Sequence, residues 1–254
     1  MPEPGPSFTV SIADTPAALT EAQALRYDVF VRELGGQGAL VDHDQGLERD
    51  AFDPFFDHMI VRDDATGAVV GVYRLLRDDQ AAAAGQFYSE AEYDLAPLRR
   101  SGRRLLELGR SCLHRDYRGG AAMYHLWTGL ADYVARHGID ILFGTASFHG
   151  TDIDALAEPL SMLHHNHLAP PDLRVRAVAE HFQPMDLVPK DRLDRKRAMV
   201  AMPALIKAYL RLGGTVGEGA FVDHAFNTTD VCLVMDTARM NDRQKRIYTG
   251  ARTG

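Results

Sequence analysis

Residues 104–121, RLLELGRSCLHRDYRGGA, hold the pattern that decides the fold of this chain. The apolar run 104–114 predicts a central strand, and a turn rich in arginine and glycine follows it. We expect a helix over 119–137, ended by a glycine, and a second strand over 139–148. A strand, a helix and a strand in this order predict a right-handed crossover between two parallel strands.

The N-terminal side adds a helix and a hairpin to this crossover. Thr15 before a proline is typical of a helix start, and the paired glycines at 35–36 are typical of a helix end. Residues 37–57 are rich in glycine, aspartate and proline without a regular period, so they predict a long loop. Two β-prone runs, 58–62 and 68–76, predict a hairpin.

The C-terminal part shows a less regular pattern. Helices are expected over 155–165 and 202–212, and strands over 173–179, 221–223 and 231–236. We find no internal repeat and no linker, and 254 residues are enough to bury one large core. The sequence therefore predicts a single α/β domain over residues 1–254, with a mixed sheet flanked by helices.

The composition is that of a folded protein outside the membrane. The chain is 46% hydrophobic and 25% charged, and it has no run of about 18 apolar residues that would span a bilayer. The first six residues, MPEPGP, lack the basic and apolar parts of a secretion signal, so a cytoplasmic location is expected. Cys112 and Cys232 lie in apolar runs, which is typical of buried, reduced thiols.

The formal charge of −7 argues against a nucleic-acid partner, which needs a basic surface. Basic residues are nevertheless clustered at 99–104 and at 190–197. Either cluster is suited to an acidic carrier protein or to peripheral contact with an anionic membrane, although a solvated face that binds nothing explains each one equally well.

The turn after the central strand has the outline of an anion site. Free backbone N–H groups and the helix dipole favour an anion where a helix begins, and glycines let a phosphate approach the main chain. A flexible entry into the helix explains the glycines equally well. The candidate phosphate-binding residues are Arg115, Arg118, Gly119, Gly120 and Ala121.

Two charged residues, Glu107 and Arg110, interrupt the apolar central strand. Burying charges in a strand is costly unless they are paired or functional. Residues three apart alternate to opposite faces, so both side chains reach one cleft only if the strand has a bulge near Gly109. We favour a functional role over a structural ion pair, because perturbed charges cluster at active sites.

Several separated motifs resemble the acyl-homoserine-lactone synthase branch of the GNAT superfamily of acyltransferases. They are Leu25-Arg26-Tyr27-Asp28-Val29-Phe30, Asp50-x-x-Asp53, Gly71-x-Tyr73-Arg74-Leu75-Leu76 and Leu106-Glu107-Leu108-Gly109-Arg110. The resemblance implies a GNAT-like fold in which the central strand and its parallel neighbour splay apart. The pantetheine arm of the acyl donor would insert between them.

A closer resemblance is to the family of L-ornithine Nα-acyltransferases, which make lyso-ornithine lipid from 3-hydroxyacyl carrier protein. It rests on residues 117–129, 163–170 and 219–231, and it extends over about 15–236. It implies acyl carrier protein and ornithine as partners, with the phosphopantetheine arm as donor group and no permanently bound cofactor.

Two departures bear on this resemblance. Ala121 and Met123 stand where the superfamily's turn usually has glycines, which fits a pantetheine arm with one phosphate better than a full pyrophosphate. The lactone-synthase branch usually has a tryptophan after its first helix, whereas the one tryptophan here is Trp127, so lactone formation is disfavoured.

The resemblance also implies roles in acyl transfer. Main-chain N–H groups after Glu107 would form an oxyanion hole for the thioester, and Glu107 is our candidate general base for the incoming amine. No serine or cysteine nucleophile is required, and Cys112 has no visible base.

Ornithine carries a carboxylate and two ammonium groups, so its pocket needs both signs of charge. Arg26, Arg74 or Arg110 could clamp the carboxylate in bidentate fashion. Asp50, Asp53, Asp223 or Asp230 could hold the side-chain ammonium, and a structural role for Asp50 and Asp53 is equally plausible. Phe30 completes the candidate substrate-binding set.

A metal site is not expected from the histidines at 164, 165 and 167, because metal sites on a helix favour ligands at i, i+3 or i, i+4 and need further ligands in space. Rival functions stay open. One is the same chemistry with glutamine, glycine or lysine as acceptor, or with acyl-CoA as donor. Another is a non-catalytic module that binds carrier protein or lipid, which would not need buried charges in its central strand.

Overall fold

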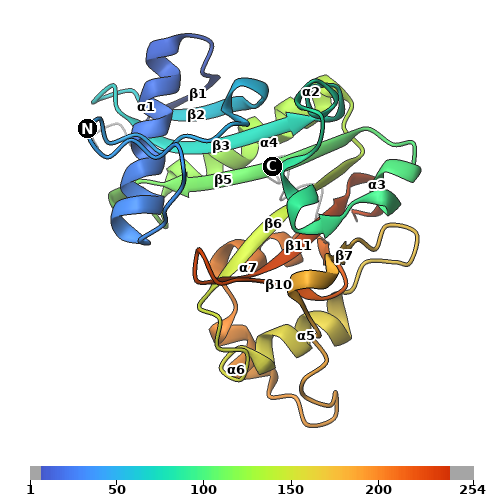
Figure 1. The fold of residues 1–254 in the computed structure, drawn as a ribbon. Coiled ribbons are helices and arrows are strands. Elements are labelled where there is room, and N and C mark those ends of the chain that lie inside the picture. The colour runs from blue at the N-terminus through green and yellow to red at the C-terminus, as the bar shows by residue number, and fades with distance from the viewer. Residues whose placement is uncertain (1–6, 241–254) are drawn as a thin grey trace, which may run out of the picture. The chain divides into compact units, whose positions relative to one another are not determined.

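The structure is a computed structural model that describes residues 7–240 of the chain (Figure 1). The chain divides into two compact units, each made of separate segments. Between residues 7 and 240, the first unit contains 7–85 and 108–138, and the second contains 86–107 and 139–240. The strand predicted over 104–114 is β5, Leu105–Leu113, and it contributes residues to both units.

The first unit is built on antiparallel strands. β1 (Phe8–Ile12) pairs with β2 (Asp57–Asp63), and β2 pairs with β3 (Val69–Arg77). β3 lies next to β5 in the sheet order. The hairpin β2–β3 confirms the prediction for residues 58–76, whereas β1 was missed although its alternating exposure is typical of an edge strand.

Helices cover both faces of this part of the sheet. α1 (Pro16–Arg26) packs against the face that carries Ile60, and α4 (Ala121–His137) against the face that carries Met59. Successive side chains of a strand point to opposite faces, so the two helices lie on opposite sides. The unit also contains α2 (Asp78–Ala84), η2 (Asp53–Phe55) and η4 (Arg115–Tyr117).

The N-terminal helix changes geometry halfway along its predicted length. Thr15 caps α1 as expected, since its Oγ1 accepts a hydrogen bond from the N–H of Ala18 at 3.2 Å. After Arg26 the chain continues as a π-helix, η1 (Tyr27–Glu33). A π-helix is rare and often occurs at functional sites, which directs attention to Arg26 at the junction.

The second unit combines parallel and antiparallel pairing. β5 and β6 (Ile141–His149) are parallel, with register from Leu105↔Ile141 to Glu107↔Phe143. β6 pairs antiparallel with β11 (Thr228–Asp236), which confirms a mixed sheet. The remaining strands are β10 (Ala220–Asp223), β8 (Phe182–Gln183), β9 (Thr215–Val216) and the pair β4 (Tyr93–Asp94) with β7 (Arg176–Ala177).

Short helices complete the second unit. They are η3 (Tyr88–Ala91), α3 (Ala96–Arg100), α5 (Ala157–His167), η5 (Ala179–His181), α6 (Arg195–Ala201), α7 (Ala204–Arg211) and η6 (Thr237–Arg239). α6 was missed, because its basic residues indicated a charged surface rather than a helix. The sequence predicted one helix over 202–212, whereas the structure ends α6 at Ala201 and starts α7 after Pro203.

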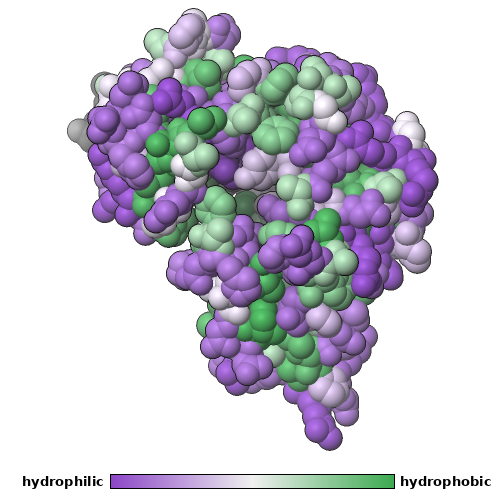
Figure 2. All heavy atoms as spheres, viewed as in Figure 1, coloured by the Kyte–Doolittle hydropathy of each residue, from purple (hydrophilic) through white to green (hydrophobic). Residues whose placement is uncertain are grey.

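Hydrophilic and apolar residues are interspersed over the face of the molecule seen in Figure 2. In the part of the chain that the structure describes, no helix is both long enough and apolar enough to cross a bilayer.

Candidate active site

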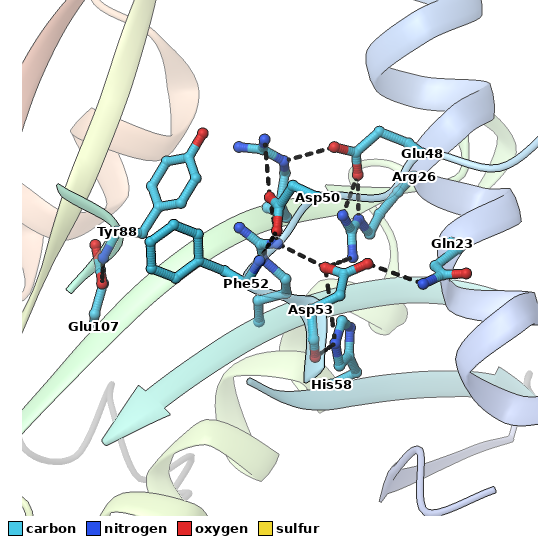
Figure 3. Close-up of polar contacts among 11 residues, drawn as sticks. Gln23, Arg26, Glu48, Asp50, Phe52, Asp53, His58, Tyr88 and Glu107 are labelled. Atoms are coloured by element: carbon cyan, nitrogen blue, oxygen red, sulfur yellow. Dashed lines mark hydrogen bonds and ion pairs between the residues drawn. The ribbon is translucent and has the colours of Figure 1, made fainter. Parts of the chain in front are cut away.

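A buried network of arginines and carboxylates occupies the first unit. Asp53, in η2, lies at its centre (Figure 3). Its Oδ1 is 2.8 Å from Nη1 of Arg26 and 2.7 Å from Nη1 of Arg74, and its Oδ2 accepts a bond from the Gln23 amide at 2.9 Å. Both arginine side chains are 0% exposed. A carboxylate shared in this way compensates two charges that would otherwise be buried unpaired.

Two loop carboxylates complete the network. Glu48 pairs with Arg26, and its Oε1 is 3.1 Å from Nε of Arg110. Asp50 lies 2.6 Å from Arg74 and 3.5 Å from Arg110. Three arginines therefore share three carboxylates, and the formal charges balance. Glu48 was missed by sequence reasoning, because nothing in the irregular loop pattern distinguishes it from the other acidic residues there.

The electrostatics of the network fix the charge state of its centre. Burial acts to raise the pKa of Asp53, but the positive charges of Arg26 and Arg74 outweigh it and hold that pKa below its usual value. His58 donates from Nε2 to the main-chain oxygen of Asp53 at 3.1 Å, and burial lowers its pKa. The ionised carboxylate therefore holds the two guanidinium groups together.

This geometry distinguishes the three arginines that were candidates for the substrate carboxylate. Arg26 and Arg74 are fully enclosed, whereas the Arg110 side chain is 23% exposed. The Arg110 guanidinium carbon also lies 5.9 Å from the centre of the Phe30 ring. Of the three, Arg110 is the one whose side chain is partly exposed, and Phe30 lies beside it.

The backbone of β5 is distorted where the sequence predicted a bulge. Arg110 has a φ of 51°, in the left-handed region, next to Gly109. Such a conformation costs on the order of 1 kcal/mol for a residue other than glycine. The ion pairs of Arg110 with Glu48 and Asp50 hold the side chain in place against this strain.

Glu107 lies in the second unit and is 1% exposed. Its carboxylate accepts hydrogen bonds from the main-chain N–H groups of Tyr88 and Ser89, at 2.7 and 2.6 Å, and from the Ser89 hydroxyl. These donors belong to the first turn of η3. Glu107 thus fixes the start of this short helix, and its role as a base stays a prediction.

The predicted phosphate-binding turn leads directly into the uncapped N-terminus of α4. Gly119 has a φ of 76°, and Gly120 precedes the first residue of α4, Ala121, without a side-chain cap on the helix. Arg118 lies 2.8 Å from Glu33 and Arg115 lies 3.5 Å from it. Both arginines are largely exposed, so an anion at the helix start would compete with Glu33 for them.

A second set of carboxyl groups lies in the second unit. Burial, followed by the nearby charges of Asp230 and Asp223, raises the pKa of Glu92 to about 8. Burial raises the pKa of Asp230 to about 6. The structure therefore brings Asp223 and Asp230 together, as candidates for an ammonium site, with Glu92, which sequence reasoning missed.

Two other residues that the sequence analysis considered, Cys112 and His165, have contacts typical of a structural role. Cys112 packs in a core cluster with Leu25, Val29 and Ile60, and burial raises the pKa of its thiol to about 12, which disfavours a nucleophilic thiolate. His165 donates from Nε2 to the main-chain oxygen of Val188 at 2.8 Å.

Solved structures with the same fold include the CoA-dependent acyl-homoserine lactone synthase BjaI. It is 15% identical, with a TM-score of 0.54, and the match covers 97% of this chain and 89% of that one. FeeM, an N-acyl amino acid synthase from uncultured soil microbes, is 12% identical, with a TM-score of 0.52, over 92% of this chain and 93% of its own.

The Acetyltransferase (GNAT) domain family matches residues 25–128, and this match, the fold and the relatives named next define an acyltransferase with a GNAT-like fold. A relative from Rhodobacter capsulatus, named L-ornithine N(alpha)-acyltransferase, is 59% identical over 96% of this chain and 95% of its own. A protein of the same name from Brucella abortus is 43% identical over 95% of this chain and 89% of its own. The chain belongs to the family of L-ornithine N(alpha)-acyltransferases.

Proposed function

We propose that this protein transfers a 3-hydroxy fatty acyl group from acyl carrier protein to the α-amine of L-ornithine, giving lyso-ornithine lipid. The main support for ornithine as the acceptor is a relative named for ornithine acylation. The two sequences are 59% identical over nearly the whole of both chains. Two arguments support acyl carrier protein as the donor. One is the family resemblance, and the other is that the turn at 115–121 suits a group with one phosphate better than a pyrophosphate.

In this proposal the phosphate of the pantetheine arm binds at the start of α4, near Arg115 and Arg118. Main-chain N–H groups that follow Glu107 polarise the thioester carbonyl as charge develops on its oxygen. The amine attacks the carbonyl carbon, the carbon–sulfur bond breaks, and the pantetheine thiol leaves. The α-carboxylate of the acceptor binds Arg110, the most exposed arginine of the network.

The attacking amine must lose a proton, and Glu107 is the proposed base. Glu107 accepts three hydrogen bonds from residues 88 and 89. Those bonds stabilise the ionised form. In the proposed reaction Glu107 takes the amine proton directly or through a water molecule.

The test combines donors and acceptors in one experiment. We expect purified protein with 3-hydroxyacyl carrier protein and ornithine to give N-acylornithine by mass spectrometry, and to give less product with lysine, glutamine or glycine. The acyl-CoA of the same chain serves as the donor control. Preference for another amino acid contradicts the acceptor, and equal or faster turnover with acyl-CoA contradicts the donor.

A further inference from the structure

Three carboxyl groups of the second unit meet on one face of its sheet. Asp230 lies opposite Ser147 of β6 and opposite Phe221 of β10 in antiparallel register, and Asp223 is two residues beyond Phe221. Residues directly opposite, or two apart along a strand, share a face. Glu92, between η3 and β4, reaches the same face through a hydrogen bond with Thr145.

Two oxygen atoms of this group are buried without a hydrogen-bond partner. They are Oδ1 of Asp230 and Oε2 of Glu92, and Asp230 is only 5% exposed. Buried polar atoms almost always have a partner, so each exception needs an explanation. A cationic donor that binds between them would satisfy the two atoms together.

The group also lacks a positive charge of its own. Among residues 7–240, no arginine, lysine or histidine forms an ion pair with Glu92, Asp223 or Asp230. Glu107, Tyr93 and Cys232 are among the other ionisable groups that affect Glu92 or are affected by it, and none of these is a cation. Buried carboxyl groups are usually paired, so this cluster is prepared for a positive charge from outside the chain.

The acidic residues of the first unit are already occupied. Asp53 bridges Arg26 and Arg74, and Asp50 pairs with Arg74 and Arg110. A substrate ammonium would have to displace a guanidinium group to bind either of them. Of the four aspartates that the sequence offers for the acceptor side chain, the two in the second unit are therefore better placed.

Asp223 and Asp230 are also not equivalent. Oδ1 of Asp223 accepts from the main-chain N–H groups of Ala225 and Phe226, at 2.8 and 3.0 Å, which is a turn-forming role. The Asp230 carboxylate accepts from the Thr228 hydroxyl through Oδ2 at 3.2 Å and is also hydrogen-bonded by Ser147, whereas its Oδ1 is buried without a partner. The hydroxyl of Tyr93 donates to the main-chain oxygen of Asp230 at 2.9 Å and fixes the strand at this position.

We propose that Glu92 and Asp230 bind the side-chain ammonium group of the amino-acid acceptor, through the two buried oxygens that have no partner. The proposal rests on the proposed function, because it assumes that the acceptor is a diamino acid. It assigns substrate selectivity to this pair.

The test compares ornithine with norvaline, which has the same carbon chain without the side-chain ammonium. The variants are Glu92→Gln and Asp230→Asn, with Glu180→Gln as a matched control on an exposed carboxyl group of the same unit. A charge-assisted bond is worth about a 10- to 100-fold change in binding. We expect each site variant to lower kcat/KM for ornithine by about this factor, mainly through KM, and to keep the norvaline rate.

The outcomes separate this inference from the proposed function. Failure of the wild-type protein to acylate ornithine refutes the function, and the inference with it. Ornithine turnover in the wild type, with an unchanged ratio of ornithine to norvaline in both variants, overturns the inference alone. Folding is checked by thermal melting near pH 8, where the variants should match or exceed the wild type because burial and mutual repulsion disfavour the charged forms of these carboxyl groups.

Discussion

Replacement of Asp53 by asparagine tests the central contact of the first unit. The change keeps the size and shape of the side chain and removes its negative charge. Arg26 and Arg74, both 0% exposed, then lose the carboxylate oxygen that lies 2.8 and 2.7 Å from them. Glu48 and Asp50 stay in place, so three guanidinium groups share two carboxylates.

The cost follows from the burial of the arginines. Removing one partner of a buried ion pair typically costs about 3–5 kcal/mol. For a chain of this size, about 1 kcal/mol corresponds to roughly 2–4 °C in Tm. We therefore expect Asp53→Asn to lower Tm by about 6–20 °C and to lower the urea midpoint, measured by far-ultraviolet circular dichroism.

Asp28→Asn is the matched control. Asp28 pairs with Arg32 at 2.6 Å, one helical turn away, but the two side chains are 43% and 64% exposed. Exposed pairs of this kind contribute about 0.3–0.5 kcal/mol. If Asp53→Asn lost no more stability than this control, the network would not be the structural centre that its geometry indicates.

Three further predictions follow from the sites described above. Glu107→Gln should lower kcat by at least about 100-fold, whereas Cys112→Ala should change kcat by no more than a few-fold. If steady-state kinetics gave the reverse pattern, the Cys112 thiol rather than Glu107 would be the reacting group. Because the pKa of Glu92 is about 8 in the fold against 4.5 ordinarily, the folded state binds the extra proton, so stability falls as pH rises from about 4.5 to 8. Glu92→Gln should reduce that fall in urea titrations, and an unaltered slope would contradict the buried position of Oε2. Arg118→Ala should raise the KM of the acyl donor about tenfold without affecting the KM of the acceptor, and an acceptor effect would argue against a phosphate site at α4.

Local rules explain what could be predicted from the sequence. The cap by Thr15, the hairpin β2–β3 and the crossover from β5 through α4 to β6 depend on residues close in sequence or on simple periods. The π-helix η1 could not be predicted this way. It is only seven residues long, and over that length its spacing of apolar residues cannot be distinguished from that of an α-helix.

The candidate site depended on contacts that no local pattern contains. The sequence indicated that Arg26, Arg74 and Arg110 need partners, but only the fold selects Glu48 among the many acidic residues of the loop. Glu92 stands in a short connection with no distinguishing neighbours. Its main charged neighbour, Asp230, is more than a hundred positions away in the chain, so the shared burial of the two is a property of the tertiary structure.

The order in which the chain builds its two units limits how the protein can be dissected. The polypeptide starts in the first unit, enters the second at residue 86, returns at 108, and leaves again at 139. A fragment ending at residue 85 therefore lacks α4 and the later part of β5, and a fragment starting at 139 lacks Glu92 and Glu107. Neither piece contains a complete unit, so both units must be expressed and folded as one chain.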